Sequence, residues 1–119
     1  MDNKIEISLL YDFYGGLLPG GQQQVVELYV NDDLSLSESA DILGISRQGV
    51  RDALSRAKRK LLDYERRLGL LGAYRERRRA MEELASAAKR IRDLTDSEEI
   101  SALSERIEAI AAAVAEKEE

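Results

Sequence analysis

The chain has 119 residues, of which 44% are hydrophobic and 34% charged, enough for one small domain or a small domain with an extension. It contains no Cys and no His, which excludes disulfides, cysteine metal sites and the commonest general base and metal ligand. No segment resembles a signal peptide or a membrane span. We therefore expect a cytoplasmic protein that is not an enzyme, uses no metal or cofactor and has no membrane partner.

The formal net charge of −5 hides a strong asymmetry along the chain. Residues 1–46 carry one basic and eight acidic side chains, residues 47–92 carry fifteen basic and six acidic, and residues 93–119 carry two basic and nine acidic. A polyanion responds to local potential more than to total charge. The basic middle therefore favours contact with nucleic acid, unless the acidic ends fold back and mask it.

The N-terminal residues predict two helices separated by a turn. Residues 4–14 place apolar side chains almost all round a helix, which predicts that it is well buried. The glycine-rich segment at residues 15–21 predicts a turn, with Pro19 near the start of the next helix. We expect that second helix to end at the polar residues 31–33.

A short helix and its caps are predicted next. Residues 35–38 (SLSE) fit a capping box, in which a serine and a glutamate satisfy the first free N–H groups of a helix. Gly44 ends this helix, Ile45 is expected to be a buried plug, and Ser46 is a good cap for the following helix.

The spacing of small and apolar residues in this region is typical of a helix-turn-helix. Ala40 is the small residue required where two helices cross, and Gly44, four residues later, tolerates the positive φ of the turn. Ile45 and Val50 supply the apolar contacts. One apolar stripe then runs down the long helix at spacings of three and four, through Val50, Leu54, Ala57, Leu61, Tyr64 and Leu68. A three-helix globule that merely packs at this angle is the alternative.

The long helix carries the candidate nucleic-acid-binding residues. Arg47, Gln48 and Arg51 project from its first turn and a half. Arg can donate two hydrogen bonds to a guanine edge and Gln can pair with adenine, each worth about 1–3 kcal/mol of discrimination. The phosphate-binding candidates are Ser46, Arg56, Lys58, Arg59 and Lys60. Gly49 lacks a side chain, which would let the helix approach a groove closely.

Residues 69–119 predict a C-terminal helical hairpin. The segment LGLLG at 68–72 marks a break, and residues 95–98 form a loop and cap between two apolar stripes. The stripes are Met81, Leu84, Ala88 and Ile91, then Ile100, Leu103, Ile107, Ile110 and Val114. Such short heptad patterns predict an antiparallel hairpin or a dimerisation arm. The basic cluster at residues 75–80 is either a solvated face or a second contact with a nucleic-acid backbone.

The run DLSLSESADILGISRQGVRDALSRAKRKLLDYE resembles region 4 of bacterial sigma factors. With the preceding SLLYDFYGGLL and the charged C-terminal helices, about residues 5–115 are similar to the YlxM family, small sigma-region-4-like proteins of Gram-positive bacteria. The resemblance implies an all-α fold, with a sigma-region-4-like helix-turn-helix core over residues 1–68 followed by the C-terminal hairpin. It also implies a regulator linked to the signal recognition particle pathway, through the proximity of the family's genes to those of the particle's GTPase and its receptor.

The sequence is compatible with three functions. The first is a DNA-binding regulator that dimerises through its C-terminal stripes and reads two half-sites. The second is an adaptor that binds the RNA of the signal recognition particle, or its GTPase, without reading DNA sequence. The third is a protein-binding module that only inherits the shape. We do not expect a complete sigma factor, because this length has no room for promoter-melting and −10-reading segments.

Overall fold

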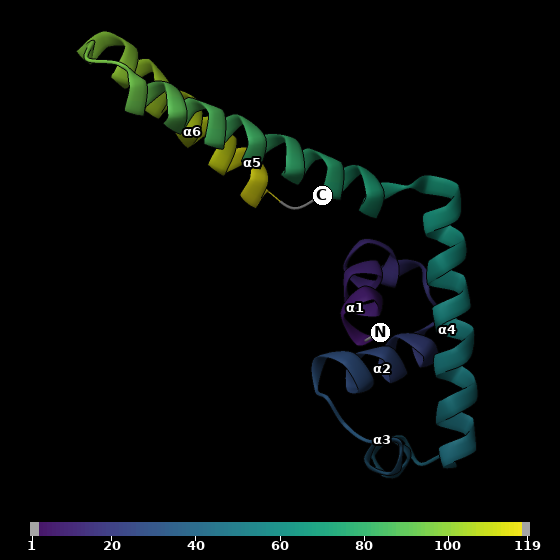
Figure 1. Cartoon of the computed structure of the whole chain (residues 1–119). Coiled ribbons are helices and arrows are strands. Elements are labelled where there is room, and N and C mark those ends of the chain that lie inside the picture. The colour runs from purple at the N-terminus through teal and green to yellow at the C-terminus, as the bar shows by residue number, and fades with distance from the viewer. Residues whose placement is uncertain (1–2, 118–119) are drawn as a thin grey trace. The chain divides into compact units, whose positions relative to one another are not determined.

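The computed structural model describes residues 3–117, and within that range the chain forms helices and no strand (Figure 1). The predicted all-α fold is confirmed. The helices are α1 (Asn3–Tyr14), α2 (Gly20–Val26), α3 (Leu36–Leu43), α4 (Arg47–Leu68), α5 (Leu70–Leu94) and α6 (Glu98–Glu116). None of these helices combines the length and apolar character needed to cross a membrane. The chain divides into two compact units, the first ending at Leu71 and the second beginning at Gly72.

The core of the first unit is built around α4, against which α1, α2 and α3 pack (Figure 1). Its fully or nearly fully buried side chains include Leu10, Tyr14, Val25, Val26, Ala40, Val50, Leu54, Ala57 and Leu61. The predicted stripe on α4 is therefore confirmed as far as Leu61, but Leu68 is exposed at the end of the helix. α1 was predicted to be well buried: Ile7, Leu10 and Tyr14 are buried where it packs on α4, whereas Ile5 lies on the solvent side.

The second helix changes its winding before it ends. A 3-10 turn (Gly15–Leu17) leads to α2, with Pro19 at the N-cap, and α2 then passes into a π-helical turn, η2 (Glu27–Asn31). Asp33 follows with a positive φ of 54° and forms an ion pair with Lys4. The Lys4 ammonium holds the pKa of the Asp33 carboxyl below its usual range. The second helix therefore ends at residues 31–33, as predicted, in a wide π-helical turn. The ion pair between Asp33 and Lys4 joins this turn to the start of α1.

The helix-turn-helix caps are formed as the spacing predicted. The Ser35 hydroxyl accepts a hydrogen bond from the Glu38 N–H at 3.1 Å, and the Glu38 carboxylate accepts one from the Ser35 N–H at 2.9 Å. Gly44 has a φ of 70°, a left-handed conformation that favours glycine because it has no Cβ. The Ser46 hydroxyl then accepts from the Gly49 N–H at 2.9 Å and begins α4.

The Glu38 cap predicts an acid dependence of stability. Hydrogen bonds from the Ser35 N–H, and then from its hydroxyl, hold the pKa of Glu38 below its usual range. Such a carboxylate stabilises the fold above its unfolded pKa, about 4.3, and that contribution is lost as pH falls through the lower folded pKa. Urea unfolding between about pH 6 and pH 3 should therefore show a smaller acid loss for Glu38→Gln than for the unmodified chain. Asp41→Asn, an exposed change on the same helix, is the control and should behave like the unmodified chain.

The end of α4 is closed by a residue from α1. α4 ends at Leu68 and is capped by Gly69, which has a φ of 66°. The break predicted over residues 68–72 is therefore this one residue between α4 and α5. The Tyr14 hydroxyl donates to the Glu65 carboxylate at 2.5 Å and accepts from the Leu70 N–H at 3.0 Å. The same carboxylate oxygen accepts from the Leu71 N–H at 3.0 Å. These bonds satisfy N–H groups at the start of α5 that have no partner within that helix.

In the second unit α5 and α6 form the expected hairpin, but its seam is narrow. The residues buried at the seam are small: Ala88, Ser104 and Ala111. Arg92 pairs with Glu108 across it, and Arg78 Nη1 donates to the Ala115 carbonyl at 2.9 Å. The larger side chains that were expected to pack together are instead about half exposed, namely Leu84, Ile91, Ile100, Leu103, Ile107 and Ile110. Two helices in contact along small residues cannot cover the bulkier side chains beside the seam.

Candidate nucleic-acid interface

The N-terminal ends of α3 and α4 border a shared hollow of about 730 Å³. Its lining brings the predicted residues Ser46, Arg47, Gln48 and Arg51 together with Ser35, Leu36 and Ser37. Both helices present their N-terminal ends here, where the helix dipole adds positive potential to the two Arg charges. The hollow therefore combines cationic and hydrogen-bonding groups suited to an anionic polymer.

Two of the three candidate base-reading residues, Gln48 and Arg51, are linked by their side chains. Arg51 Nη1 donates to Gln48 Oε1 at 3.0 Å, and Gln48 Nε2 donates to Asp52 Oδ1 at 2.9 Å. All of these side chains are exposed, so a base edge can replace either bond. The chain of bonds orients Gln48 between Arg51 and the carboxylate of Asp52.

If this surface binds a duplex, the Asp52 carboxylate weakens the binding, because it repels phosphates. We expect Asp52→Asn to tighten binding on the order of threefold at about 0.15 M salt, with the smallest effect at high salt. Fluorescence anisotropy with unrelated duplexes measures this. Asp96→Asn, an exposed change in the second unit, should leave the affinity unchanged. Weaker binding by Asp52→Asn would show instead that Asp52 contacts a base or positions Gln48.

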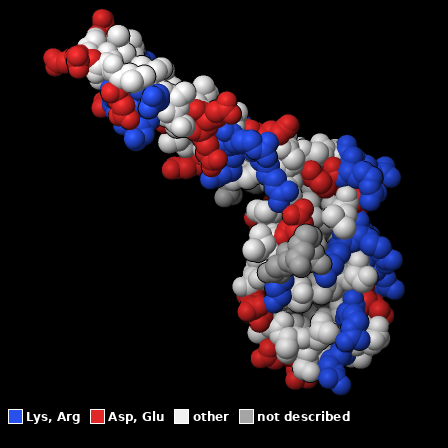
Figure 2. All heavy atoms as spheres, viewed as in Figure 1, with Lys and Arg blue, Asp and Glu red and all other residues white. Residues whose placement is uncertain are grey.

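Two of the later basic residues, Arg56 and Lys60, lie on a different side of α4 from Arg51. Arg56, Arg59 and Lys60 border a separate hollow of about 390 Å³ with Asp63 and Tyr64. Lys60 lies nine residues after Arg51, which puts the two on opposite sides of α4 at 3.6 residues per turn. Figure 2 shows the basic side chains spread along the length of α4. A single duplex cannot lie along both sides at once, so these residues fall into two groups.

Lys58 is placed differently from the other predicted phosphate-binding residues. It is half-buried, and its ammonium lies over the Tyr29 ring, 5.5 Å from the centroid. Lys4 lies over the same ring at 4.7 Å. A cation held on an aromatic face is partly satisfied before any phosphate arrives, so Lys58 also serves the packing of η2 against α4.

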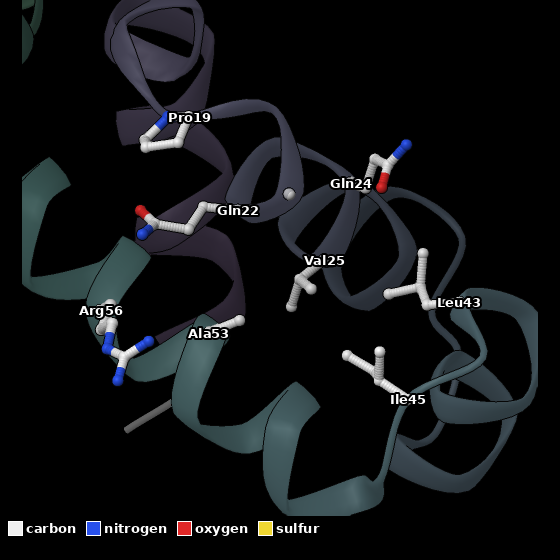
Figure 3. A pocket seen from close by; sticks show the side chains of 9 residues that line it. Pro19, Gln22, Gln24, Val25, Leu43, Ile45, Ala53 and Arg56 are labelled. Atoms are coloured by element: carbon white, nitrogen blue, oxygen red, sulfur yellow. The ribbon is translucent and has the colours of Figure 1, made fainter.

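Ile45 in the turn and Gly49 in the first turn of α4 have surroundings that differ from those predicted. Ile45 was predicted to be a buried plug but is 45% exposed, because it borders an open pocket between α2 and α4 (Figure 3). At Gly49 a Cβ would lie 3.2 Å from Ser46 Oγ and 3.5 Å from Ile45 Cδ1. The missing side chain therefore leaves room for the helix cap, whereas the sequence predicted that it serves close approach to a groove.

Sequence reasoning missed three polar neighbours of this interface: Asp52, Ser35 and Ser37. Asp52 could have been found from its spacing, since residues four apart lie on the same side of a helix. Ser35 and Ser37 were visible only as part of a capping motif. Their position beside Arg47 and Arg51 depends on how α3 packs against α4.

The basic cluster of the second unit is partly engaged within the hairpin. The guanidinium groups of Arg77 and Arg78 lie 5.7 and 5.9 Å from the centroid of the Tyr74 ring. Arg78 also bonds to the Ala115 carbonyl of α6. This arginine therefore holds the two helices together, which accounts for one member of the cluster without a nucleic-acid partner.

Comparison with known proteins identifies the family. Residues 1–102 match the UPF0122 family, described as "Putative helix-turn-helix protein, YlxM / p13 like". A UPF0122 protein of Caldanaerobacter subterraneus is 46% identical over 83 residues, covering 70% of this chain and 71% of the relative. One from Thermoanaerobacter sp. is 38% identical over 106 residues, 89% of this chain and 91% of the relative. One from Symbiobacterium thermophilum is 43% identical over 84 residues, 71% and 78% respectively. The chain therefore belongs to the UPF0122 family of YlxM/p13-like helix-turn-helix proteins.

Proposed function

We propose that this protein is a non-enzymatic, cytoplasmic DNA-binding regulator that inserts the start of α4 into a major groove. The observation that carries the proposal is the hollow in which Arg47, Gln48 and Arg51 lie together beside the N-terminal ends of α3 and α4. In this role the three side chains read base edges, and Ser46 bonds to a phosphate. The Ser46 hydroxyl already accepts the Gly49 N–H, and its own proton remains available to a phosphate oxygen.

Selection from a randomised duplex library at about 0.15 M salt, near physiological ionic strength, tests this function. The Arg47/Gln48/Arg51 triple-alanine variant runs in parallel. We expect a recovered sequence motif that disappears with the triple change, because the three side chains carry the base contacts. An unenriched pool, or a motif that the triple variant also selects, would contradict the proposal.

The spread of basic side chains over two sides of α4 favours a second candidate, an adaptor in the signal recognition particle pathway. Arg56, Arg59 and Lys60 lie together, away from the base-reading hollow, and suit a nucleic-acid backbone read without regard to sequence. The particle's RNA and its GTPase are the partners to test if the duplex selection returns no motif. If Arg59→Ala weakens binding to that RNA and Arg51→Ala does not, the result would support the adaptor.

We further propose that residues 69–119 are a dimerisation arm and that a second copy covers their apolar face. The large side chains of the two stripes flank the seam of Ala88, Ser104 and Ala111, and because the helices run antiparallel both sets fall on the same side of it. A layer of two helices with one apolar face is half of a four-helix bundle.

Sedimentation equilibrium should give a dimer that Ile107→Lys shifts towards monomer, whereas Ala109→Lys, an exposed change on the same helix, should not. A monomer at all concentrations would contradict the arm.

A further inference from the structure

The two helices of the hairpin contribute side chains of different size to its apolar face. α6 contributes a large aliphatic side chain at every turn, namely Ile100, Leu103, Ile107, Ile110 and Val114. α5 contributes Leu84 and Ile91, but the positions three or four residues before them on the same side are Ala80 and Ala87, both exposed. The apolar face is therefore recessed over parts of α5 and raised along α6.

The two helices also carry net charges of opposite sign. α5 has seven basic and four acidic side chains, whereas α6 has one basic and five acidic side chains. Within the hairpin the two signs attract each other, as in the ion pair between Arg92 and Glu108. A further helix that packs against α5 is therefore favoured if it is acidic, and one that packs against α6 is favoured if it is basic.

A second copy can cover the apolar face in two symmetric ways, because most homodimers have a two-fold axis. If the axis is parallel to the helices, α5 of each copy lies over α6 of the other, and both hairpin turns lie at the same end of the four-helix bundle. If the axis crosses the helices at a right angle, α5 lies over α5, α6 lies over α6, and the turns lie at opposite ends. Neighbouring helices run antiparallel in both arrangements, so helix direction does not distinguish them.

The register of the hairpin determines which residues face each other when the axis is parallel to the helices. Arg78 Nη1 donates to the Ala115 carbonyl, which places these two residues at about the same level along the hairpin. Ala87 is nine residues further along α5 and Ile107 is eight residues back along α6, so they too are about level. A parallel axis keeps every level unchanged. The recess at Ala87 of one copy then lies opposite Ile107 of the other.

We propose that two copies associate with the axis parallel to the helices, so that α5 of each copy covers α6 of the other. This inference rests on the proposed dimerisation arm and adds the arrangement of the two copies. It places small side chains opposite large ones and helices of opposite net charge together. The crossed axis would pack the large α6 side chains against one another, leave the sparser α5 side chains to one another, and bring helices of like charge together.

The arrangement decides where the first units are attached to the bundle. The first unit of each copy ends at the start of α5, so a parallel axis attaches both units at the same end. A crossed axis would attach them at opposite ends, separated by roughly the length of α5, about 37 Å for its 25 residues. With the parallel axis, the two base-reading helices can therefore contact two neighbouring half-sites.

A spin-label distance separates the two arrangements. The chain has no Cys, so Asp96→Cys introduces one labelling site at an exposed position in the turn between α5 and α6. Pulsed electron paramagnetic resonance should give a label-to-label distance below about 30 Å, because turns at the same end are only a few helix diameters apart. Sedimentation equilibrium of the same labelled protein reports whether it is dimeric. A monomer at all concentrations would overturn both the arm and this inference, whereas a dimer with a longer distance would overturn the arrangement alone.

An exchange of side-chain size provides an independent test. Ala87→Leu forces two large side chains together in the proposed arrangement and should weaken dimerisation at least about tenfold. Ile107→Ala should weaken it through lost burial, but the double variant should regain most of the affinity that Ala87→Leu loses. Ala109→Leu makes the same change at an exposed position on the other side of α6 and should have no effect. An Ala87→Leu chain that dimerises as tightly as the unmodified chain, or additive losses in the double variant, would contradict the arrangement.

Discussion

Tyr14→Ala should lower the free energy of unfolding of the first unit by about 3–5 kcal/mol, as expected for loss of a buried aromatic ring. Tyr14 is only 1% exposed, and its ring centroid lies 6.2 Å from that of Phe13 and 5.9 Å from that of Tyr64. The change removes this packing and also both hydrogen bonds of the hydroxyl. Burial, and then the bond to Glu65, raise the pKa of Tyr14, so the hydroxyl stays protonated and able to donate throughout the physiological range.

Urea unfolding followed by tyrosine fluorescence measures this loss, because the chain has no Trp and four of its five tyrosines lie in the first unit. Tyr14→Phe keeps the ring and removes only the hydroxyl. It should cost about 1–3 kcal/mol, because the Leu70 N–H and the Glu65 carboxylate each lose a buried partner. A Phe variant as stable as the original chain would mean that water replaces the hydroxyl. An Ala variant that loses less than about 1 kcal/mol would contradict the burial of the ring.

Arg51→Ala and Arg59→Ala should weaken DNA binding in different ways. If Arg51 pairs with a base, its loss should cost about 1–3 kcal/mol at the preferred site and should relax the choice of base at one position. Arg59 lies in the hollow away from the base-reading residues, so its loss should weaken binding to all sequences and reduce the slope of log affinity against log salt by about one. Competition with matched and single-mismatch duplexes at several salt concentrations separates the two results. If both variants lose affinity uniformly, Arg51 does not read a base.

Much of the first unit could be predicted from sequence because its determinants are local. The cap residues Ser35 and Ser46 and the positive φ of Gly44 follow from rules that operate within one helical turn. The stripe from Val50 to Leu61 follows from the helical repeat. The π-helical turn η2 and the exposure of Ile45 could not be predicted in this way, because both depend on how α2 packs against α4 in the folded chain.

Only part of the candidate site could be predicted from sequence. Arg47, Gln48 and Arg51 could be grouped from their spacing at the start of one helix. The separation of Arg51 from Lys60 also follows from helical geometry, although the later basic residues were predicted as one phosphate-binding set. The position of Lys58 on the Tyr29 ring requires the tertiary structure, since it depends on a contact between α4 and η2.

The bonds at the end of α4 have a consequence for the time course of folding. Tyr14 and Glu65 are 51 residues apart, and the same network includes the N–H groups of Leu70 and Leu71. During synthesis α1 leaves the ribosome long before these partners have been made. The face of α1 that is buried in the folded chain is therefore exposed to solvent during that time. Ribosome-bound chains stopped before Glu65 should therefore remain sensitive to protease in α1. Protection should begin only after Leu71 has emerged from the exit tunnel.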